Sequence, residues 1–309
     1  NYKGEGIGQG WLGIRFQAAP RQRPSEIIIH VRMLDPEIIR EQEALGIVGI
    51  NLIYGAFYLS GSPVRLISSL TDGLSKARIE VDMISMSGPC FAGVDNRLMA
   101  LQLVEQGLTE AAMFKADGEA VIPSEILYKK PVLVERGSFR PLTNPMLEML
   151  ERSHEQFIKE PALEGETPIT ILEMTIRQLQ VGDYIDHVDF LDRVETLSAL
   201  KRPVLISNFR RYHRLVHYIG QHTQKMIGLP LGLALLKSIL EEDFYTDLDG
   251  CLMESLGQLF RHGVKLYVYP LRNHETGEVY TLDTLEVPAN VKHLYKHLIE
   301  NGFIDEIEH

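Results

Sequence analysis

The sequence predicts an α/β protein with a mostly parallel, doubly wound open sheet and helices on both faces. Stretches with strand character alternate with helical stretches along nearly the whole chain, which is typical of βαβ units. Some strands are unbroken apolar runs, such as Ile27-Ile28-Ile29, and these indicate burial on both faces, as in a parallel sheet. The strands are unevenly spaced, which favours an open sheet over a closed eightfold barrel.

The first part of the chain predicts a lead-in, a strand and two helices. Residues 1–25 are rich in glycine, and we expect them to form a loop-like segment. The segment 26–33 predicts a strand. Asp35-Pro36 then predicts a helix start, with the aspartate as N-cap and the proline as the first helical residue. That helix is expected to run on into a glycine-rich packing face at 44–59, and a second helix is expected at 63–74.

The alternation continues to the C-terminus. The further expected strands are 78–85, 110–116, 131–136, 203–207, 224–229 and 264–269. The further expected helices are 95–106, 143–157, 169–180, 184–200, 210–221, 231–240, 249–260 and 290–301. We expect one large domain over 1–309, with the polar loop 159–168 as a possible internal boundary.

Composition narrows the classes of partner and compartment. The formal net charge of −11 over 309 residues leaves no broad basic footprint, so we expect no nucleic-acid partner. No apolar run is long enough to cross a bilayer, so we expect no membrane partner. The two cysteines, Cys90 and Cys251, are few for a secreted scaffold and predict a cytoplasmic location.

Cationic residues recur where the predicted strands end. Ligands of open parallel sheets bind outside the carboxyl ends of the strands, and a planar guanidinium suits phosphate or carboxylate. These residues could therefore converge on an anion. The alternative is that each of them pairs with a nearby carboxylate and has no further role. They are Arg32, Lys115, Arg136, Arg140, Arg210 and Arg211.

The stretch 131–151 predicts a buried strand, a tight glycine turn and the start of a helix. Gly137 allows a sharp turn, Ser138 offers a hydroxyl and a backbone N–H, and Phe139 is expected to bury as an anchor. With Thr143 as a cap, several N–H groups and a helix N-terminus point at one spot, which is a ready anion site. We therefore expect a nucleotide or another phosphorylated small metabolite to bind here. The candidate binding residues are Arg136, Gly137, Ser138, Arg140, Thr143, Asn144, Ser207 and Arg210.

The run Gly137-Ser138-Phe139-Arg140-Pro141-Leu142-Thr143-Asn144 resembles the signature of the nucleotidylyltransferase superfamily, especially of the nicotinamide and nicotinate mononucleotide adenylyltransferases. The resemblance implies a nucleotidyltransferase-like transferase whose turn holds the phosphates of ATP, together with Mg²⁺. Met146 stands where that family has an essential histidine, and a thioether cannot donate a charged hydrogen bond to a developing phosphate charge. The segment Ser207-Asn208-Phe209-Arg210 resembles a second family motif that ends in arginine.

Longer segments of the chain are similar to a bacterial family whose members often carry the mononucleotide adenylyltransferase name. Members of that family generally have a further N-terminal segment, so the resemblance implies that this chain lacks it. The segments are IIIHVRMLDPE, GVDNRLMALQLVEQGL, LYKKPVLVERGSFRP and YTDLDGCLMESLGQLF.

Three alternatives stay open. Asp247 and Asp249 could share a divalent cation near a phosphate, or Asp249 could instead cap the following helix. The protein could be a non-enzymatic scaffold or assembly protein, with the glycine-rich helix at 44–59 forming a homo-oligomer contact. It could also be one lobe of a larger enzyme that a missing N-terminal part completes.

Overall fold

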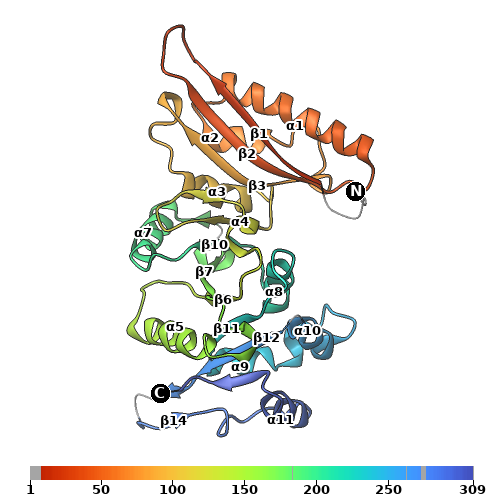
Figure 1. The fold of residues 1–309 in the computed structure, drawn as a ribbon, viewed down its shortest axis with the longest axis vertical. Coiled ribbons are helices and arrows are strands. Elements are labelled where there is room, and N and C mark those ends of the chain that lie inside the picture. The colour runs from red at the N-terminus through yellow and green to blue at the C-terminus, as the bar shows by residue number, and fades with distance from the viewer. Residues whose placement is uncertain (1–7, 183, 262, 273–275, 309) are drawn as a thin grey trace. The chain divides into compact units, whose positions relative to one another are not determined.

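The computed structural model describes residues 8–182, 184–261, 263–272 and 276–308 (Figure 1). The chain divides into two compact units, each built from two separate segments. Unit 1 contains the described residues up to Ile122 together with Ile176–Asn208, and unit 2 contains the rest. The single large domain stays a prediction, and the polar loop 159–168 lies inside unit 2.

Unit 1 contains an antiparallel sheet of three strands in the order β1-β2-β3. β1 (Gly8–Phe16) pairs with β2 (Ser25–Met33), and β2 pairs with β3 (Ile79–Ser87). The strand predicted at 26–33 is confirmed as β2. Its expected parallel setting is wrong, because both of its neighbours run antiparallel to it.

The expected loop over 1–25 is wrong for β1, while residues 1–7 lie outside the described residues. Leu12, Ile14 and Phe16 follow a period of two and pack against the core of unit 1. Glycines stand among these apolar residues and conceal the alternation in the sequence.

Two helices cover one face of this sheet. α1 (Ile38–Tyr58) turns a buried stripe toward the sheet, and α2 (Pro63–Ser69) packs beside α1. A Cβ on Gly55 would lie 2.9 Å from Leu66 Cγ, so the glycine allows the two helices to approach closely. The buried residues of α1 are Ala44, Val48, Leu52, Gly55 and Ala56.

The rest of unit 1 combines longer helices with short strands. Strands β10, β4 and β5 pair antiparallel in that order. These elements are α3 (Asn96–Glu105), β4 (Ala111–Phe114), β5 (Ala120–Val121), α7 (His187–Ser198) and β10 (Val204–Ser207). Smaller elements are η1 (Pro89–Phe91), α6 (Ile176–Leu179), β8 (Gln180–Val181) and β9 (Tyr184–Ile185).

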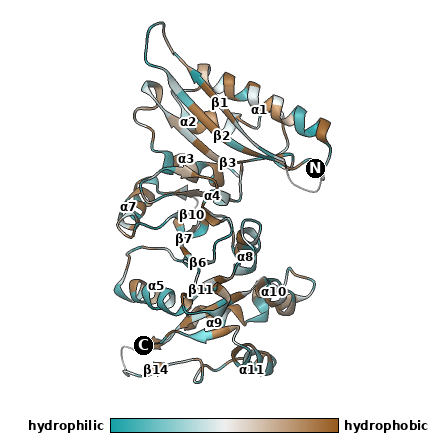
Figure 2. Ribbon diagram, in the orientation of Figure 1, coloured by the Kyte–Doolittle hydropathy of each residue, from teal (hydrophilic) through white to brown (hydrophobic). Residues whose placement is uncertain are grey.

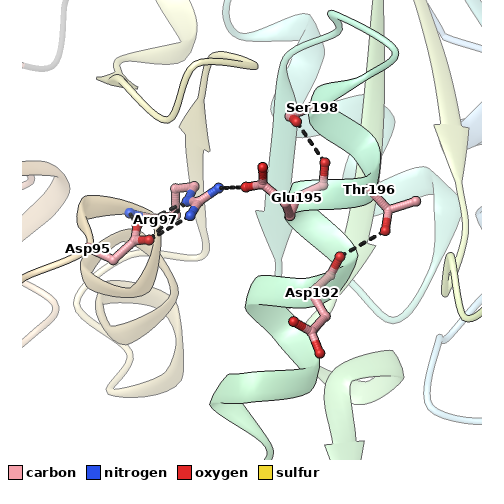
Figure 3. A network of polar contacts seen from close by, with 6 residues as sticks. All are labelled: Asp95, Arg97, Asp192, Glu195, Thr196 and Ser198. Atoms are coloured by element: carbon pink, nitrogen blue, oxygen red, sulfur yellow. Dashed lines mark hydrogen bonds and ion pairs between the residues drawn. The ribbon is translucent and has the colours of Figure 1, made fainter.

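An arginine joins the two segments of unit 1. The Asp95 side chain caps α3, and the guanidinium of Arg97 donates back to the same carboxylate, with Nη2 at 2.6 Å (Figure 3). Arg97 Nη1 also donates to Glu195 Oε2 of α7 at 3.2 Å (Figure 3). Because Glu195 is exposed, this ion pair contributes little to the free energy of unfolding.

Unit 2 contains a parallel sheet with the strand order β15-β12-β11-β6-β7. Most residues of the strands in the interior of this sheet are apolar and buried, which matches burial by helices. The strands are β6 (Val132–Arg136), β7 (Ile169–Thr175), β11 (Ile227–Gly232), β12 (Val264–Tyr269) and β15 (Ile304–Glu306).

Helices and short elements connect these strands. The helices are α4 (Pro123–Leu127), α5 (Asn144–Phe157), α8 (Tyr212–Gly220), α9 (Leu233–Ile239), α10 (Cys251–Leu259) and α11 (Lys292–Glu300). The remaining elements are η2 (Pro161–Leu163), η3 (Glu242–Tyr245), β13 (Leu271–Arg272) and β14 (Val279–Tyr280).

The helix expected over 169–180 is wrong, because most of this segment is strand β7. β7 pairs in parallel with β6 in the register Val132↔Ile169 to Arg136↔Glu173. Residues Thr170 to Thr175 are all buried, so the apolar pattern is that of an interior strand, which short sequence windows confuse with a buried helix.

The α/β class is confirmed, and the parallel strands of the large sheet belong to unit 2. The doubly wound arrangement stays a prediction. Within the described residues, every helix is too short or too polar to cross a lipid bilayer.

Candidate functional site

The strand order of unit 2 reverses direction between β6 and β11. From β6 the chain passes through α5 to β7 on one side, whereas β11, β12 and β15 extend the sheet on the other side. In open α/β sheets the crevice outside the carboxyl ends of two such strands is where ligands bind. The turn of residues 137–143 follows β6 at this place, and Gly232 ends β11 beside it.

The turn after β6 alternates buried and exposed residues. Phe139 is 3% exposed and has a left-handed φ of 49°, so it anchors the turn as the sequence predicts. Ser138 and Arg140 on either side of it are exposed. A Cβ on Gly137 would lie 2.9 Å from the Met146 methyl and 3.0 Å from the Phe139 ring. The glycine is therefore required for close packing, and Met146 occupies the space above it.

The N-terminus of α5 is open to an anion. Thr143 is the N-cap residue with extended backbone angles, as the sequence predicts, but its side chain makes no capping hydrogen bond. Asn144 begins the helix, Pro145 follows it, and the first turn contains no acidic residue. The positive end of the helix dipole therefore meets no acidic side chain of its own first turn.

Arg136 is held by a buried carboxylate. Its Nε lies 2.5 Å from Glu173 Oε2 and its Nη2 lies 2.9 Å from Glu173 Oε1, which is a bidentate ion pair. Its guanidinium carbon lies 4.6 Å from the centre of the Tyr212 ring. Burial raises the pKa of the Tyr212 hydroxyl. These contacts fix the guanidinium at the end of β6 and match the alternative that the sequence left open, in which an arginine pairs with a carboxylate.

Glu135 is a buried acid without a hydrogen-bond partner among the described residues. Its side chain is on the same face of β6 as Leu133 and Gly137, because side chains alternate along a strand. Leu133 packs with Phe157 of α5, and Gly137 packs with Met146 of α5, so Glu135 faces the same helix. The residue is 1% exposed, and burial raises the pKa of its carboxyl to about 8.

Two further residues shape the edge of the sheet beside the turn. Gly232 ends β11 with extended backbone angles, and a Cβ placed there would meet nothing within 4 Å. Tyr269 ends β12 and donates from its hydroxyl to Glu148 Oε2 of α5 at 2.9 Å. The hydroxyl contact ties the end of β12 to α5, and the space that a side chain at Gly232 would take stays open.

The remaining cationic candidates do not converge at the turn. Arg32 pairs with Glu80 at 2.8 Å, and Lys115 pairs with Glu119 at 2.6 Å, both within unit 1. Arg211 pairs with a carboxylate of unit 2, that of Asp247. Arg210 is exposed just before α8, two residues from Tyr212, whereas Ser207 is fully buried in β10 of unit 1.

The predicted metal candidates are exposed residues near α10. The guanidinium of Arg211 lowers the pKa of the Asp247 carboxyl through their hydrogen bond. The N-cap of α10 is Gly250, so the alternative in which Asp249 caps this helix is wrong. Among the described residues, no group of three or more acidic, histidine or cysteine side chains is arranged to hold a metal ion.

Sequence reasoning missed Glu135, Glu173 and Gly232. A signal for the first existed, since an acid within the apolar run Val132–Arg136 must be buried if the run is a buried strand. Glu173 lies in the segment 169–180, which the sequence predicts as a helix. A helix would not place Glu173 opposite Arg136 on a neighbouring strand, so the sequence does not reveal this pair.

Comparisons with protein-family models, with curated proteins and with solved structures found no match to this chain. The resemblance to the nucleotidylyltransferase superfamily therefore rests on the residues of the turn and of the segment 207–210 alone.

Proposed function

We propose that unit 2 binds a nucleotide or another phosphorylated small metabolite at the turn of residues 137–143. The observation that supports this proposal is that two features of the molecule occur at the same place. The turn that resembles a phosphate-binding signature stands at the reversal of strand order, and it leads into a helix with no side-chain cap and no acid in its first turn.

The exposed polar groups of the turn supply the contacts. Ser138 offers its hydroxyl, Arg140 offers a guanidinium, and Thr143 and Asn144 offer side-chain oxygens and nitrogen beside the helix start. Arg136 holds the end of β6 through its ion pair, so it positions the turn and does not contact the ligand.

Buried acids near the turn do not oppose an anion. Arg136 neutralises Glu173 through two hydrogen bonds. Glu135 is protonated at neutral pH because burial raises its pKa to about 8. Arg140 and the dipole of α5 both attract phosphate.

The finer proposal is a doubly wound unit that performs nucleotidyl transfer with Mg²⁺ bound to the nucleotide. The contact of Met146 with Gly137 makes Met146 a packing group, so charge stabilisation in the reaction falls to Arg140. The free thiols of Cys90 and Cys251 support a cytoplasmic location.

A thermal-shift titration tests binding. The protein is titrated with ATP, nicotinamide mononucleotide, nicotinate mononucleotide and NAD, each with and without Mg²⁺. A ligand that binds only the folded state raises the midpoint in a concentration-dependent way. Arg140→Ala should abolish the rise, and Arg152→Ala, a change two turns along α5, should preserve it. No rise at millimolar ligand, or an equal rise in the Arg140 variant, would overturn the proposal.

A further inference from the structure

The face of β1 that points away from α1 is exposed along the length of the strand. Leu12, Ile14 and Phe16 pack into the core that α1 covers, and side chains alternate along a strand. The residues between them therefore lie on the opposite face, where all of them are exposed. β1 is also an edge strand, because it pairs with β2 alone among the described strands. The exposed residues are Gln9, Trp11, Gly13 and Arg15.

Trp11, the only tryptophan of the chain, is held in position on this face. Its ring centre lies 4.9 Å from that of His30, at an interplanar angle of 61°. The two rings therefore do not stack on each other, and Trp11 stays 50% exposed. His30 is buried, and its Nδ1 lies 2.6 Å from Oδ1 of Asp82, which is also buried. Because this pair fixes the imidazole and the imidazole supports the indole, a ring that stacks on Trp11 meets a preorganised side chain.

Gly13 leaves open space beside Trp11. A Cβ on Gly13 would lie 3.7 Å from the carbonyl oxygen of Ile27 and 3.8 Å from Cγ1 of Ile28, which are ordinary contact distances. Packing within the sheet therefore does not require a glycine at this position. A glycine inside a strand often marks a place where a ligand approaches closely. Trp11 and Gly13 are about 7 Å apart on the same face, so a flat ring above Gly13 would lie against the indole.

The strand leads into a basic hairpin tip. From Gly8 to Ser25 the chain contains three arginines and no acidic residue. All three arginines are exposed, and none of them forms an ion pair with a described residue. One of them, Arg21, has a left-handed φ of 67°, a conformation that is uncommon for arginine and does not explain its presence in the turn. The three residues are Arg15, Arg21 and Arg23.

The acidic residues of α1 lie at the opposite end of β1 from this tip. A Cβ on Gly8 would lie 3.1 Å from Oε1 of Glu41, near the N-terminal end of α1, where the ribbon is teal (Figure 2). From Gly8 to Arg15 the strand spans about 24 Å, which exceeds the Debye length of about 8 Å at physiological ionic strength. Glu26 stands opposite Arg15 in the register without forming an ion pair with it, so the tip keeps a positive charge. The expectation of no nucleic-acid partner rests on the net charge of the whole chain, −11, whereas the charge at this tip has the opposite sign.

We propose that the exposed face of β1 and the tip of the β1–β2 hairpin bind single-stranded nucleic acid, with a base stacked on Trp11 above Gly13 and phosphates held by the arginines of the tip. An aromatic side chain for stacking and a positively charged track for the backbone are the two parts of sequence-tolerant single-strand binding. Trp11 lies about 14 Å from Arg15 along the strand, and the tip continues beyond Arg15, so the surface suits several units of a chain. An acidic peptide would pair with the arginines, but only a nucleic acid repeats a ring and an anion in every unit. This surface lies on unit 1 and does not depend on the ligand proposed for unit 2.

Two fluorescence measurements test the proposal. Because the chain has a single tryptophan, its emission reports on this face alone, and octamers of uridine or of thymidine should quench it. The anisotropy of a labelled octamer gives the dissociation constant. With three phosphate contacts, the logarithm of the association constant should fall with the logarithm of the salt concentration with a slope of about −2. Arg21→Ala with Arg23→Ala should raise the dissociation constant by about tenfold or more near about 50 mM salt and reduce the slope to about −0.7. Lys292→Ala with Lys296→Ala, which removes two exposed charges from α11, is the matched control and should leave both values unchanged.

A second variant tests the stacking without a change of charge. Gly13→Leu fills the space beside Trp11 and should raise the dissociation constant by about tenfold while the circular dichroism stays that of wild type. An absence of quenching at millimolar octamer, or an unchanged affinity in the arginine variant or in Gly13→Leu, would overturn the proposal. Equal binding of polyglutamate would overturn it in favour of an acidic protein partner. Equal affinity for uridine monophosphate would overturn it in favour of a site for one nucleotide.

Discussion

The buried carboxyl of Glu135 should make the stability of the protein depend on pH. The carboxyl is 1% exposed and has no hydrogen-bond partner among the described residues, and burial raises its pKa from 4.5 to about 8. In the unfolded chain the same group is in water and has its ordinary pKa. Replacing it by glutamine keeps the size of the side chain and removes the proton that titrates.

The sign of the effect follows from proton binding in the two states. Below pH 4.5 the carboxyl is protonated in both states, and the folded state has its full stability. As the pH rises, the unfolded state releases the proton first, so stability is lost progressively until the pH passes about 8. At about 1.4 kcal/mol per pH unit, the interval between the two pKa values corresponds to a loss on the order of 5 kcal/mol.

The assay is urea unfolding followed by circular dichroism at a series of pH values between the two pKa values. Wild type should lose stability toward the upper end relative to Glu135→Gln, and the two proteins should be closest at the lower end. Glu151→Gln, a change at an exposed acid of α5, is the control and should follow wild type. Parallel pH profiles for wild type and Glu135→Gln would refute the raised pKa and the reasoning from burial.

Three smaller predictions use the same urea assay. Gly228→Ala should lower the free energy of unfolding by about 1–3 kcal/mol, because the new Cβ would lie 2.7 Å from Leu133 Cδ1. Gly232→Ala in the same strand should change it by less than about 0.5 kcal/mol, because nothing lies within 4 Å of a Cβ there. Equal effects of the two substitutions would count against the packing described for β11. Glu173→Gln should cost about 3–5 kcal/mol, because it leaves the guanidinium of Arg136 buried without its charge partner, and a change below about 1 kcal/mol would show that the pair is dispensable. Tyr212→Phe should be neutral or stabilising by up to about 1 kcal/mol, because the hydroxyl is buried without a hydrogen-bond partner among the described residues, and clear destabilisation would mean that the hydroxyl has one.

The elements that the sequence predicts well are those with a single dominant signal. The strand at 131–136 and the helix after it are confirmed as β6 and α5, because an apolar run of strand length is followed by a proline near the helix start. The sequence of β7 predicts a helix instead, because an interior strand and a buried helix share the same apolar composition. The sequence of β1 predicts a loop, because its glycines interrupt a period of two.

The sequence predicts where the candidate site lies in the chain, but it does not predict which charged side chains of the site pair with one another. The carboxyl end of β6 and the start of α5 follow from chain order alone, and so does the exposure of a polar turn between them. The role of Arg136 depends on its register with Glu173, which is a contact across strands that no local pattern contains. Likewise, the order of β6 and β11 in the sheet follows from long-range pairing, and the reversal that marks the site is visible only in the fold.

The buried acid and the proposed anion site should be coupled through charge. Glu135 lies two residues before Gly137 in the chain, and a bound phosphate disfavours ionisation of a nearby carboxyl. Binding free energies are reciprocal, so ionisation of Glu135 should weaken the ligand by the same amount by which the ligand stabilises the proton. Affinity for ATP should therefore fall as the pH passes about 8 in wild type and should not show this step in Glu135→Gln. The affinity of both proteins for the same nucleotide is measured by calorimetry at each pH. Ionisation of the nucleotide itself affects both proteins equally and cancels in the comparison. An identical step in both proteins would show that Glu135 does not sense the ligand, and the site would then lie further from the α5 face of β6 than the turn of residues 137–143.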